Sequence, residues 1–317
     1  MKKFNTVLMV FFFFVSAVSG YSQCRPFNDD GLIAPKNAQE ANRIAQECAN
    51  PMLDQFIQNA SRHLNREDHD KELLNGIEYA SNVYDFIKLA KSCTMVEYRD
   101  IVLQYGMTKA ISVNDYIALA RNAAKNINRD KILVEGSKYA QNPDEFVSLA
   151  GFCVNSNSKD VIAERGSSKF LNSNDALRLS RAAGSRKTSG NILKKASYSA
   201  SNLNEILMLA NACLDASSKD FILEYGTRFA LTAENFRTLS LYSESSESRC
   251  KILLKGSNYA KNIYDIMTLA ERADINGYRD AIAVNGLKFA SNENDYRVLA
   301  SCAGTKKMKS QILARIR

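Results

Sequence analysis

The sequence predicts an all-α fold, a right-handed α-solenoid of about eight stacked 30-residue helical hairpins with degenerate repeats at its ends. From Lys71 to Ser310 the chain repeats one short pattern every 30 residues without an insertion, which is typical of repeat architectures. One leucine recurs in the second half of every block, and a small residue always follows it. These leucines are Leu89, Leu119, Leu149, Leu179, Leu209, Leu239, Leu269 and Leu299.

The first half of each block has the spacing of a helix with one buried stripe. In the block 131–160, Ile132, Leu133, Gly136 and Ala140 follow one another at steps of one, three and four residues. Glycine recurs mid-helix in seven of the eight blocks, although it costs roughly 1 kcal/mol relative to alanine there. We therefore expect another helix to pass too close for a side chain at Gly76, Gly106, Gly136, Gly166, Gly226, Gly256 and Gly286.

An aspartate closes five blocks directly before this helical pattern: Asp100, Asp130, Asp160, Asp220 and Asp280. A carboxylate at a helix start accepts hydrogen bonds from the free backbone amides of the first turn. We therefore expect the first helix of each block to begin at this aspartate.

The second half of each block has its own helix start signal, a polar residue with Asp, Glu or Asn three positions later. The expected caps are Asn82, Ser112, Asn142, Asn172, Asn202, Thr232, Asn262 and Asn292. Helices of about 10 residues are marginal alone, so the predicted hairpins must stack to cover their apolar faces.

This organisation resembles the α-solenoid repeat proteins, most nearly the short HEAT-like type, over nearly the whole chain after its N-terminus. The 30-residue period and the absence of W-x-x-L-G and T-P-L-H signatures separate the sequence from tetratricopeptide and ankyrin repeats. The resemblance implies stacked hairpins that contact only their neighbours.

The N-terminal residues predict a secretory signal peptide over residues 1–22. Lys2 and Lys3 precede an apolar run of about 12 residues, shorter than the roughly 20 of a membrane-spanning helix. Cleavage after Ser19 or Ser22 satisfies the small-residue rule, whereas an uncleaved anchor and lipidation at Cys24 are the minor alternatives. We expect a periplasmic or extracellular protein with no transmembrane segment after cleavage. Residues 23–40 are interpreted as a leader or irregular cap, 41–70 as a degenerate capping repeat and 311–317 as a truncated repeat.

Seven cysteines in an exported chain suggest disulfides, but the repeat argues against most of them. Cys93, Cys153 and Cys213 share one repeat position that accepts alanine or serine in other blocks, which indicates selection for small volume. We expect buried free thiols there, and only the pair Cys24 and Cys48 is kept as a candidate disulfide.

The fourth block departs from the pattern and is strongly basic. It has Ala163, Lys169, Phe170, Ala176 and Gly190 where other blocks place different residue types. Between residues 161 and 200, eight bases outnumber two acids, and an anionic partner is expected to dock there. The predicted partner-binding residues are Arg165, Lys169, Arg178, Arg181, Arg186, Lys187, Lys194 and Lys195. The competing interpretation is a solvated loop, GSRKTSG, with tolerated drift.

Three weaker signals are each interpreted structurally first. A Lys or Arg precedes the aspartate position in seven blocks, which predicts a ladder of ion pairs with nearby acids rather than a basic rail for a polyanion. Six tyrosines at outward positions suit either contact surfaces or packing over neighbouring repeats: Tyr84, Tyr105, Tyr198, Tyr225, Tyr242 and Tyr264. His63 and His69 lie in a polar stretch and are expected to be solvated rather than to bind a metal.

The function expected from the sequence is a non-enzymatic scaffold that binds a protein with an acidic patch. We expect no catalytic residue, cofactor or metal, because the chain carries no phosphate-binding glycine loop, zinc-type cysteine spacing or nucleophile elbow. The alternative is binding of an acidic glycan or envelope lipid head group through the basic fourth block. A polysaccharide-acting enzyme is less favoured, and no nucleic-acid partner is expected.

Overall fold

The fold is all-α and repetitive, as predicted, in a computed structural model that describes residues 27–28, 31–32 and 50–316. The predicted signal peptide, the leader apart from one strand pair, residues 41–49 of the capping repeat, and Cys24 and Cys48 lie outside these residues. In that pair, β1 (Phe27–Asn28) and β2 (Gly31–Leu32) are antiparallel, with Phe27 opposite Leu32.

The described helices form two compact units by their contacts. Unit 1 contains the described residues up to Gln141 and Ser148–Ser158, and unit 2 contains Asn142–Val147 and the described residues from Lys159 onward. Helices α9 and α10 therefore contribute residues to both units.

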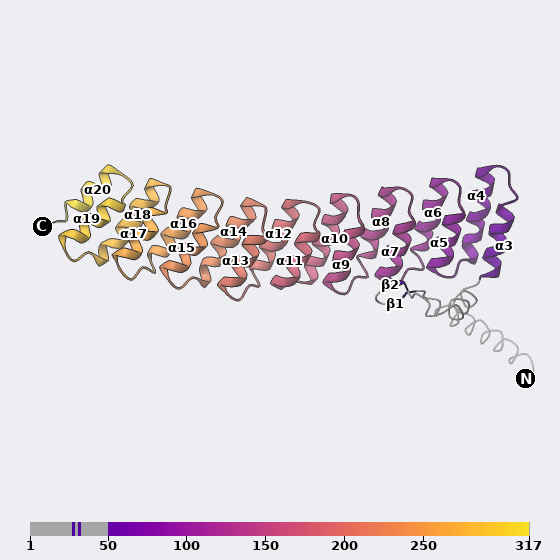
Figure 1. The fold of residues 1–317 in the computed structure, drawn as a ribbon, viewed down its shortest axis with the longest axis horizontal. Helices are drawn as coiled ribbons and strands as arrows, with labels where there is room; N and C mark the ends of the chain where they lie inside the picture. Colours follow the sequence, from indigo (N-terminus) through magenta and orange to yellow (C-terminus); the bar gives the residue numbers. More distant parts are fainter. Residues whose placement is uncertain (1–26, 29–30, 33–49, 317) are drawn as a thin grey trace, which may run out of the picture. The chain divides into compact units, whose positions relative to one another are not determined.

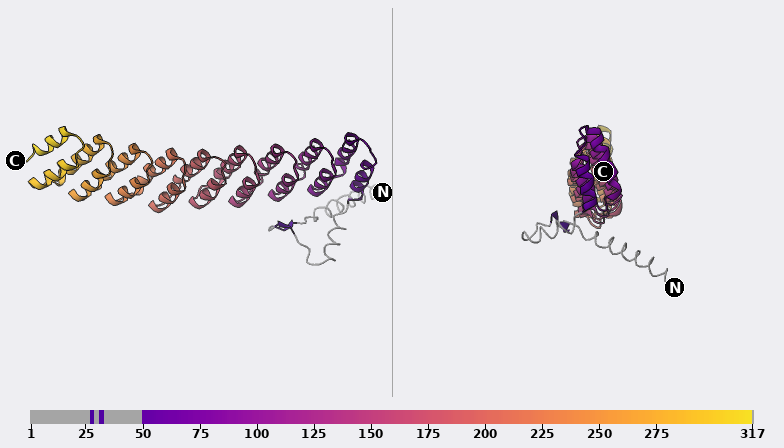
Figure 2. Two further views of the ribbon diagram at one scale, coloured as in Figure 1. Left: turned by 45° about the horizontal axis from the view of Figure 1, so that its top comes forward. Right: turned by 90° about the vertical axis from the view of Figure 1, so that its right-hand side faces the viewer.

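Within each unit, even-numbered and odd-numbered helices form two layers (Figure 1 and Figure 2). The even layer contains α4 (Arg66–Asn75), α6 (Val96–Gly106), α8 (Asn126–Gly136), α10 (Ser156–Lys169), α12 (Arg186–Ser197), α14 (Ala216–Gly226), α16 (Ser246–Ser257), α18 (Asn276–Gly286) and α20 (Lys306–Leu313). The odd layer contains α3 (Pro51–Ala60), α5 (Val83–Ser92), α7 (Val113–Asn122), α9 (Pro143–Phe152), α11 (Ser173–Ala182), α13 (Leu203–Ala212), α15 (Ala233–Leu241), α17 (Ile263–Glu271) and α19 (Glu293–Cys302). Single-turn 3-10 helices η1 (Gly76–Tyr79), η2 (Thr227–Phe229) and η3 (Leu287–Phe289) follow α4, α14 and α18.

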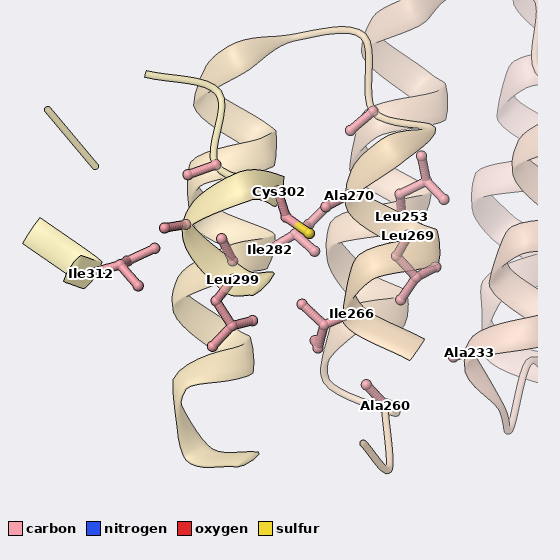
Figure 3. Close-up of a cluster of buried hydrophobic side chains, with 14 of the residues drawn as sticks. Ala233, Leu253, Ala260, Ile266, Leu269, Ala270, Ile282, Leu299, Cys302 and Ile312 are labelled. Atoms are coloured by element: carbon pink, nitrogen blue, oxygen red, sulfur yellow. The ribbon is translucent and has the colours of Figure 1, made fainter. Parts of the chain in front are cut away.

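The core lies between the two layers, and the apolar residues that recur in each block contribute to it. All eight recurring leucines are fully buried. Near the C-terminal end, Ile266 and Leu269 of α17 meet Ile282 of α18 and Leu299 of α19 (Figure 3). The apolar stripes predicted from the sequence are therefore confirmed as the inner faces of the two layers.

At six of the seven recurring glycines a Cβ atom would lie within 3.0 Å of a side chain of an adjacent odd-layer helix, and at Gly76 the nearest atom, from Leu89, would be 3.2 Å away. A Cβ built at Gly256 would lie 2.5 Å from Cβ of Phe236, and one at Gly226 would lie 2.3 Å from Cγ2 of Ile206. Because real Cβ atoms do not approach so closely, the predicted close passage at these positions is confirmed.

The predicted caps of the odd layer are confirmed, but the predicted start of the even layer is wrong. Asn82, Asn202 and their counterparts accept the backbone N–H of the third helical residue. The even-layer helices begin four residues before the aspartate position, for example at Val96 rather than Asp100. For the same reason Arg186 and Lys187 belong to the first turn of α12, and the segment interpreted as the loop GSRKTSG is helical from Arg186 onward.

The recurring aspartate joins neighbouring blocks instead of capping its own helix. Asp100 is buried inside α6, and its carboxylate accepts the backbone N–H groups of Ala124 at 2.8 Å and Lys125 at 3.2 Å, just before α8 begins. We call this arrangement the aspartate staple. It recurs at Asp70, Asp100, Asp130, Asp160, Asp220 and Asp280, each accepting N–H groups 24 and 25 residues further along the chain.

Two junctions between blocks lack the recurring aspartate and have other polar contacts. At the first, Gly190 stands in its place, and Asp215 from the following loop caps α14 through the N–H of Ser218 at 2.8 Å. At the second, Cys250 stands in its place, and Arg249 forms an ion pair with Asp274 from the following loop. The following loop thus carries an aspartate of its own at both junctions.

We expect the aspartate staples to make the free energy of unfolding decrease at low pH. Burial raises the pKa of Asp280, but hydrogen bonds from Thr305 and Gly304 outweigh it, and the pKa is lowered from its usual value. The same balance, with hydrogen bonds from Thr94, His69 and Met95, lowers the pKa of Asp70. A carboxyl whose pKa is lower in the folded state stabilises the fold above its unfolded pKa of about 3.9, and this contribution is lost as pH falls through the folded pKa.

Urea titrations between pH 7 and pH 2 will check this expectation. The free energy of unfolding is expected to stay nearly flat down to about pH 4 and to fall steeply below it. Replacing both Asp70 and Asp280 by asparagine should make that acid limb shallower, and an unchanged limb would contradict the assignment.

Five cysteines in the described residues are buried and form no disulfide: Cys93, Cys153, Cys213, Cys250 and Cys302. The prediction of buried thiols is therefore confirmed for the three that share a repeat position. Burial raises the pKa of Cys93 to about 12 and also raises the pKa of Cys213 and Cys302.

These thiols are expected to resist modification in the folded protein. Because the thiolate is the reactive form, a disulfide reagent at pH 8 should label them at least about 100-fold more slowly in buffer than in denaturant. Peptide mapping after timed labelling separates them from Cys24 and Cys48. Labelling of Cys93 within seconds in buffer would show that this thiol is accessible to solvent and would contradict the prediction.

Candidate interaction surface

The eight predicted partner-binding residues do not gather on one surface of unit 2. Arg165 and Lys169 lie on α10, Arg178 and Arg181 on α11, and Arg186, Lys187, Lys194 and Lys195 on α12. Since α10 and α12 belong to the even layer and α11 to the odd layer, their outward faces point in opposite directions (Figure 1). The basic residues expected to form a single patch are therefore divided between the outward faces of the two layers.

The odd-layer part of this set is partly neutralised. Helix α11 buries Ala176 and Leu179 against its neighbours and exposes Arg178 and Arg181 on the other side. Arg178 forms ion pairs with Asp144 and, at 3.9 Å, with Asp175. Exposed pairs of this kind contribute little stability, but they leave less charge for a partner.

The first turn of α12 carries Arg186 and Lys187, both exposed. Cations at a helix N-terminus are unfavourable because the helix dipole is positive there. Ser185 caps this end by accepting the N–H of Thr188 at 3.2 Å. The two cations lie at the end of α12 opposite to Lys194 and Lys195, so they do not extend the surface around those lysines.

Part of the irregularity of the fourth block is explained by packing. In three other blocks an aromatic ring packs on a ring of the preceding odd-layer helix, as Tyr259 does on Phe236 at 4.9 Å between centroids. In the fourth block Phe170 packs edge-on against Phe146 at 6.2 Å, one position later than usual. The Lys169 ammonium lies 5.5 Å from the centre of the same Phe146 ring. In this block Phe170 therefore supplies the ring that packs on Phe146, and the position of the usual aromatic residue is occupied by Lys169.

An aromatic and cationic cluster lies on the outward side of α12 and α14, next to the fourth block. Tyr198 packs edge-on against Phe221 at 5.9 Å and Tyr225 at 4.9 Å, and the last two rings are parallel at 6.1 Å. The Lys194 ammonium lies 4.0 Å from the centre of the Phe221 ring. We call Lys194, Lys195, Tyr198, Phe221, Tyr225 and Arg228 the aromatic–cationic surface.

Arg228 anchors this surface to the backbone. Its guanidinium lies 4.1 Å from the centre of the Tyr225 ring and donates hydrogen bonds to the carbonyls of Tyr198 at 3.3 Å and Ala200 at 3.1 Å. The contacts hold Tyr198, which is half exposed, in a fixed position. Arg228 therefore orders the surface as well as adding charge to it.

The sequence pointed to only part of this surface. Lys194, Lys195, Tyr198 and Tyr225 were candidates, whereas Arg228 was missed. Phe221 was also missed, although it is an aromatic residue at a repeat position where other blocks have Lys, Ile, Val, Asn or Ala. This exception to the repeat pattern could have identified Phe221 as a candidate.

Some of the remaining sequence candidates have structural partners in the described residues. Among the seven cations that precede the aspartate position, Lys219 pairs with Glu244 at 2.5 Å, Arg249 pairs with Asp274, and Arg279 donates to the carbonyl of Cys302 at 3.2 Å. Two of these seven cations thus have an ion pair in the described residues, and both pair with an acid of the following loop. His69 lies 2.7 Å from Asp70, and no group of three or more His, Cys, Asp or Glu residues with metal-binding proximity occurs in the described ranges. In that same part of the chain, no helix has the length and apolar character needed to cross a bilayer.

Comparisons with known proteins find similar solved structures but no family. No family model and no curated protein matches the sequence. One similar solved structure is titled "Computational Design of Self-Assembling Cyclic Protein Homooligomers", with 14% identity over 87% of this chain and 90% of that chain and a TM-score of 0.12. Another is titled "Circular tandem repeat protein with novel repeat topology and enhanced subunit contact surfaces", with 15% identity over 87% of this chain and 58% of that chain and a TM-score of 0.12.

Proposed function

We propose that this protein is an exported, non-enzymatic scaffold that binds another protein through the outward faces of its helical layers. In this proposal residues 71–310 form a right-handed α-solenoid of eight 30-residue hairpins, residues 41–70 cap it and residues 311–317 begin a further repeat. The signal peptide of residues 1–22 directs the chain to the periplasm or the extracellular space.

The observation that supports this proposal best is the contrast between constant buried positions and varied exposed positions. The buried leucine is the same in every block. One outward position of the even layer holds Arg165, Lys195, Tyr225, Lys255 and Asn285 in successive blocks. Solenoids use such extended faces to bind other macromolecules.

The alternative function is binding of an acidic glycan or envelope lipid through the basic fourth block. Its support is the excess of eight bases over two acids between residues 161 and 200. The division of these bases between two layers, and the pairing of Arg178 with two aspartates, make a single polyanion site less favourable. An enzyme that acts on polysaccharide is the third hypothesis, and turnover of an acidic glycan by purified protein would support it.

Fractionation and crosslinking in the native host test the proposed function. We expect the protein in the periplasm or the medium, with a new N-terminus at Gly20 or Gln23. Crosslinking should yield a reproducible complex with one polypeptide. Recovery in the cytoplasm with Met1 intact would contradict export, and salt-sensitive retention of glycan or lipid with no polypeptide would favour the alternative.

A further inference from the structure

We propose that the aromatic–cationic surface of α12 and α14 is the docking site, and that it binds an acidic polypeptide segment that carries apolar side chains between its carboxylates. This inference rests on the proposed scaffold function and names the site and the chemistry of the partner.

The position of Tyr198 is the first argument. In the blocks of Tyr139 and Tyr259 the aromatic residue stands one position later and packs on a buried ring, as Tyr139 does on Tyr116 at 5.1 Å. For the block of Tyr198 the corresponding position on the preceding helix is Ala176, which has no ring. Tyr198 has instead moved to the outward face, where 52% of its surface is exposed. The core does not need this ring, so its place in the surface calls for another explanation.

The charge of the surface is the second argument. In the described residues, Lys194, Lys195 and Arg228 form no ion pair with a carboxylate. Lys255 of α16 adds a further cation at its edge, where it donates to the hydroxyl of Thr227 at 2.8 Å. Uncompensated cations beside exposed aromatic rings are complementary to carboxylates that arrive with apolar groups.

The geometry of the rings favours a polypeptide over a glycan. A sugar ring stacks on an open aromatic face, but Lys194 covers Phe221 and Arg228 covers Tyr225. Tyr and Arg are also the residue types that contribute most binding energy in protein interfaces. A protein segment can place carboxylates on the cations and pack side chains against the exposed parts of the three rings.

A photocrosslinking residue placed at Lys195 in the native host tests the inference. The matched control is the same residue at Arg181, which is also exposed but lies on α11 in the odd layer. We expect a polypeptide crosslinked from position 195, with its attached peptide richer in Asp and Glu than in Lys and Arg, at a yield at least tenfold above that from position 181. The double change Tyr198→Ala and Tyr225→Ala should lower this yield at least tenfold, whereas Tyr264→Ala, an exposed tyrosine on α17, should leave it within twofold.

Each other outcome overturns a defined part of the argument. An equal or higher yield from position 181 would keep the scaffold and reject this surface. A crosslinked peptide without an acidic excess would reject the partner chemistry. If no polypeptide is crosslinked at either position, the proposed function itself fails, and binding of purified protein to polygalacturonate would then assign the surface to an acidic glycan.

Discussion

Replacement of Asp100 by alanine is expected to lower the free energy of unfolding by about 2–4 kcal/mol. The carboxylate accepts the N–H groups of Ala124 and Lys125 and the side-chain amide of Asn128, at 2.8, 3.2 and 2.7 Å. Hydrogen bonds to a charged group contribute about 1.5–3 kcal/mol each, and water can replace part of this because the loop is partly exposed. Urea denaturation followed by circular dichroism measures the loss, and amide exchange at Ala124 and Lys125 locates it.

Two variants make the Asp100 result specific. Asp100→Asn keeps an acceptor oxygen for one N–H group, so we expect about half the loss of the alanine variant. Glu67→Ala removes an exposed carboxylate that pairs with Lys71 and should leave the free energy of unfolding nearly unchanged. If Glu67→Ala and Asp100→Ala lower the free energy of unfolding equally, the staple does not stabilise the contact between blocks.

Replacement of Gly256 by leucine is expected to cost about 3 kcal/mol or more, because overpacking a filled site forces side chains and backbone to shift. A Cβ atom there would lie 2.5 Å from Cβ and 2.9 Å from Cγ of Phe236, which is fully buried and cannot move away at its base. The measurement is again urea denaturation. We also expect increased exposure of the surrounding core to a hydrophobic dye.

Gly151 is the matched control, since it lies in helix α9 with no atom within 4 Å of a built Cβ. Gly151→Ala is expected to stabilise the protein by roughly 0.5–1 kcal/mol through helix propensity alone. A destabilising effect of Gly151→Ala, or a neutral effect of Gly256→Leu, would show that close approach is not what selects glycine.

The features that could be predicted from the sequence are those whose cause is local or strictly periodic. The caps at Asn82 and its counterparts act within three residues, and the buried leucines follow from spacing along one helix. Volume constraints at Gly256 and Cys93 were also predictable, because the same position carries only small residues in block after block. Each of these constraints recurs in the eight blocks, so an exception in a single block does not hide the pattern.

The features that could not be predicted depend on which residues meet across blocks. A carboxylate before an apolar run has the same pattern whether it caps its own helix or accepts amides 24 residues later, and Asp100 does the second. The basic residues of the fourth block are close in sequence, but consecutive helices of a hairpin face opposite sides. Arg178 and Lys195 were therefore grouped by sequence and are separated by the fold.

The uneven distribution of aspartate staples has a mechanical consequence. A pull along unit 2 loads the junctions between blocks in series, so the one with the fewest cross-block bonds gives way first. At Gly190 the staple is missing, because Asp215 caps its own helix, and the polar link across this junction is the Ser173 hydroxyl, which donates to Glu205 at 3.1 Å. At Cys250 the ion pair of Arg249 with Asp274 still spans the junction. In force spectroscopy, we expect the first extension step to open at Gly190, which makes this position the natural hinge under tension.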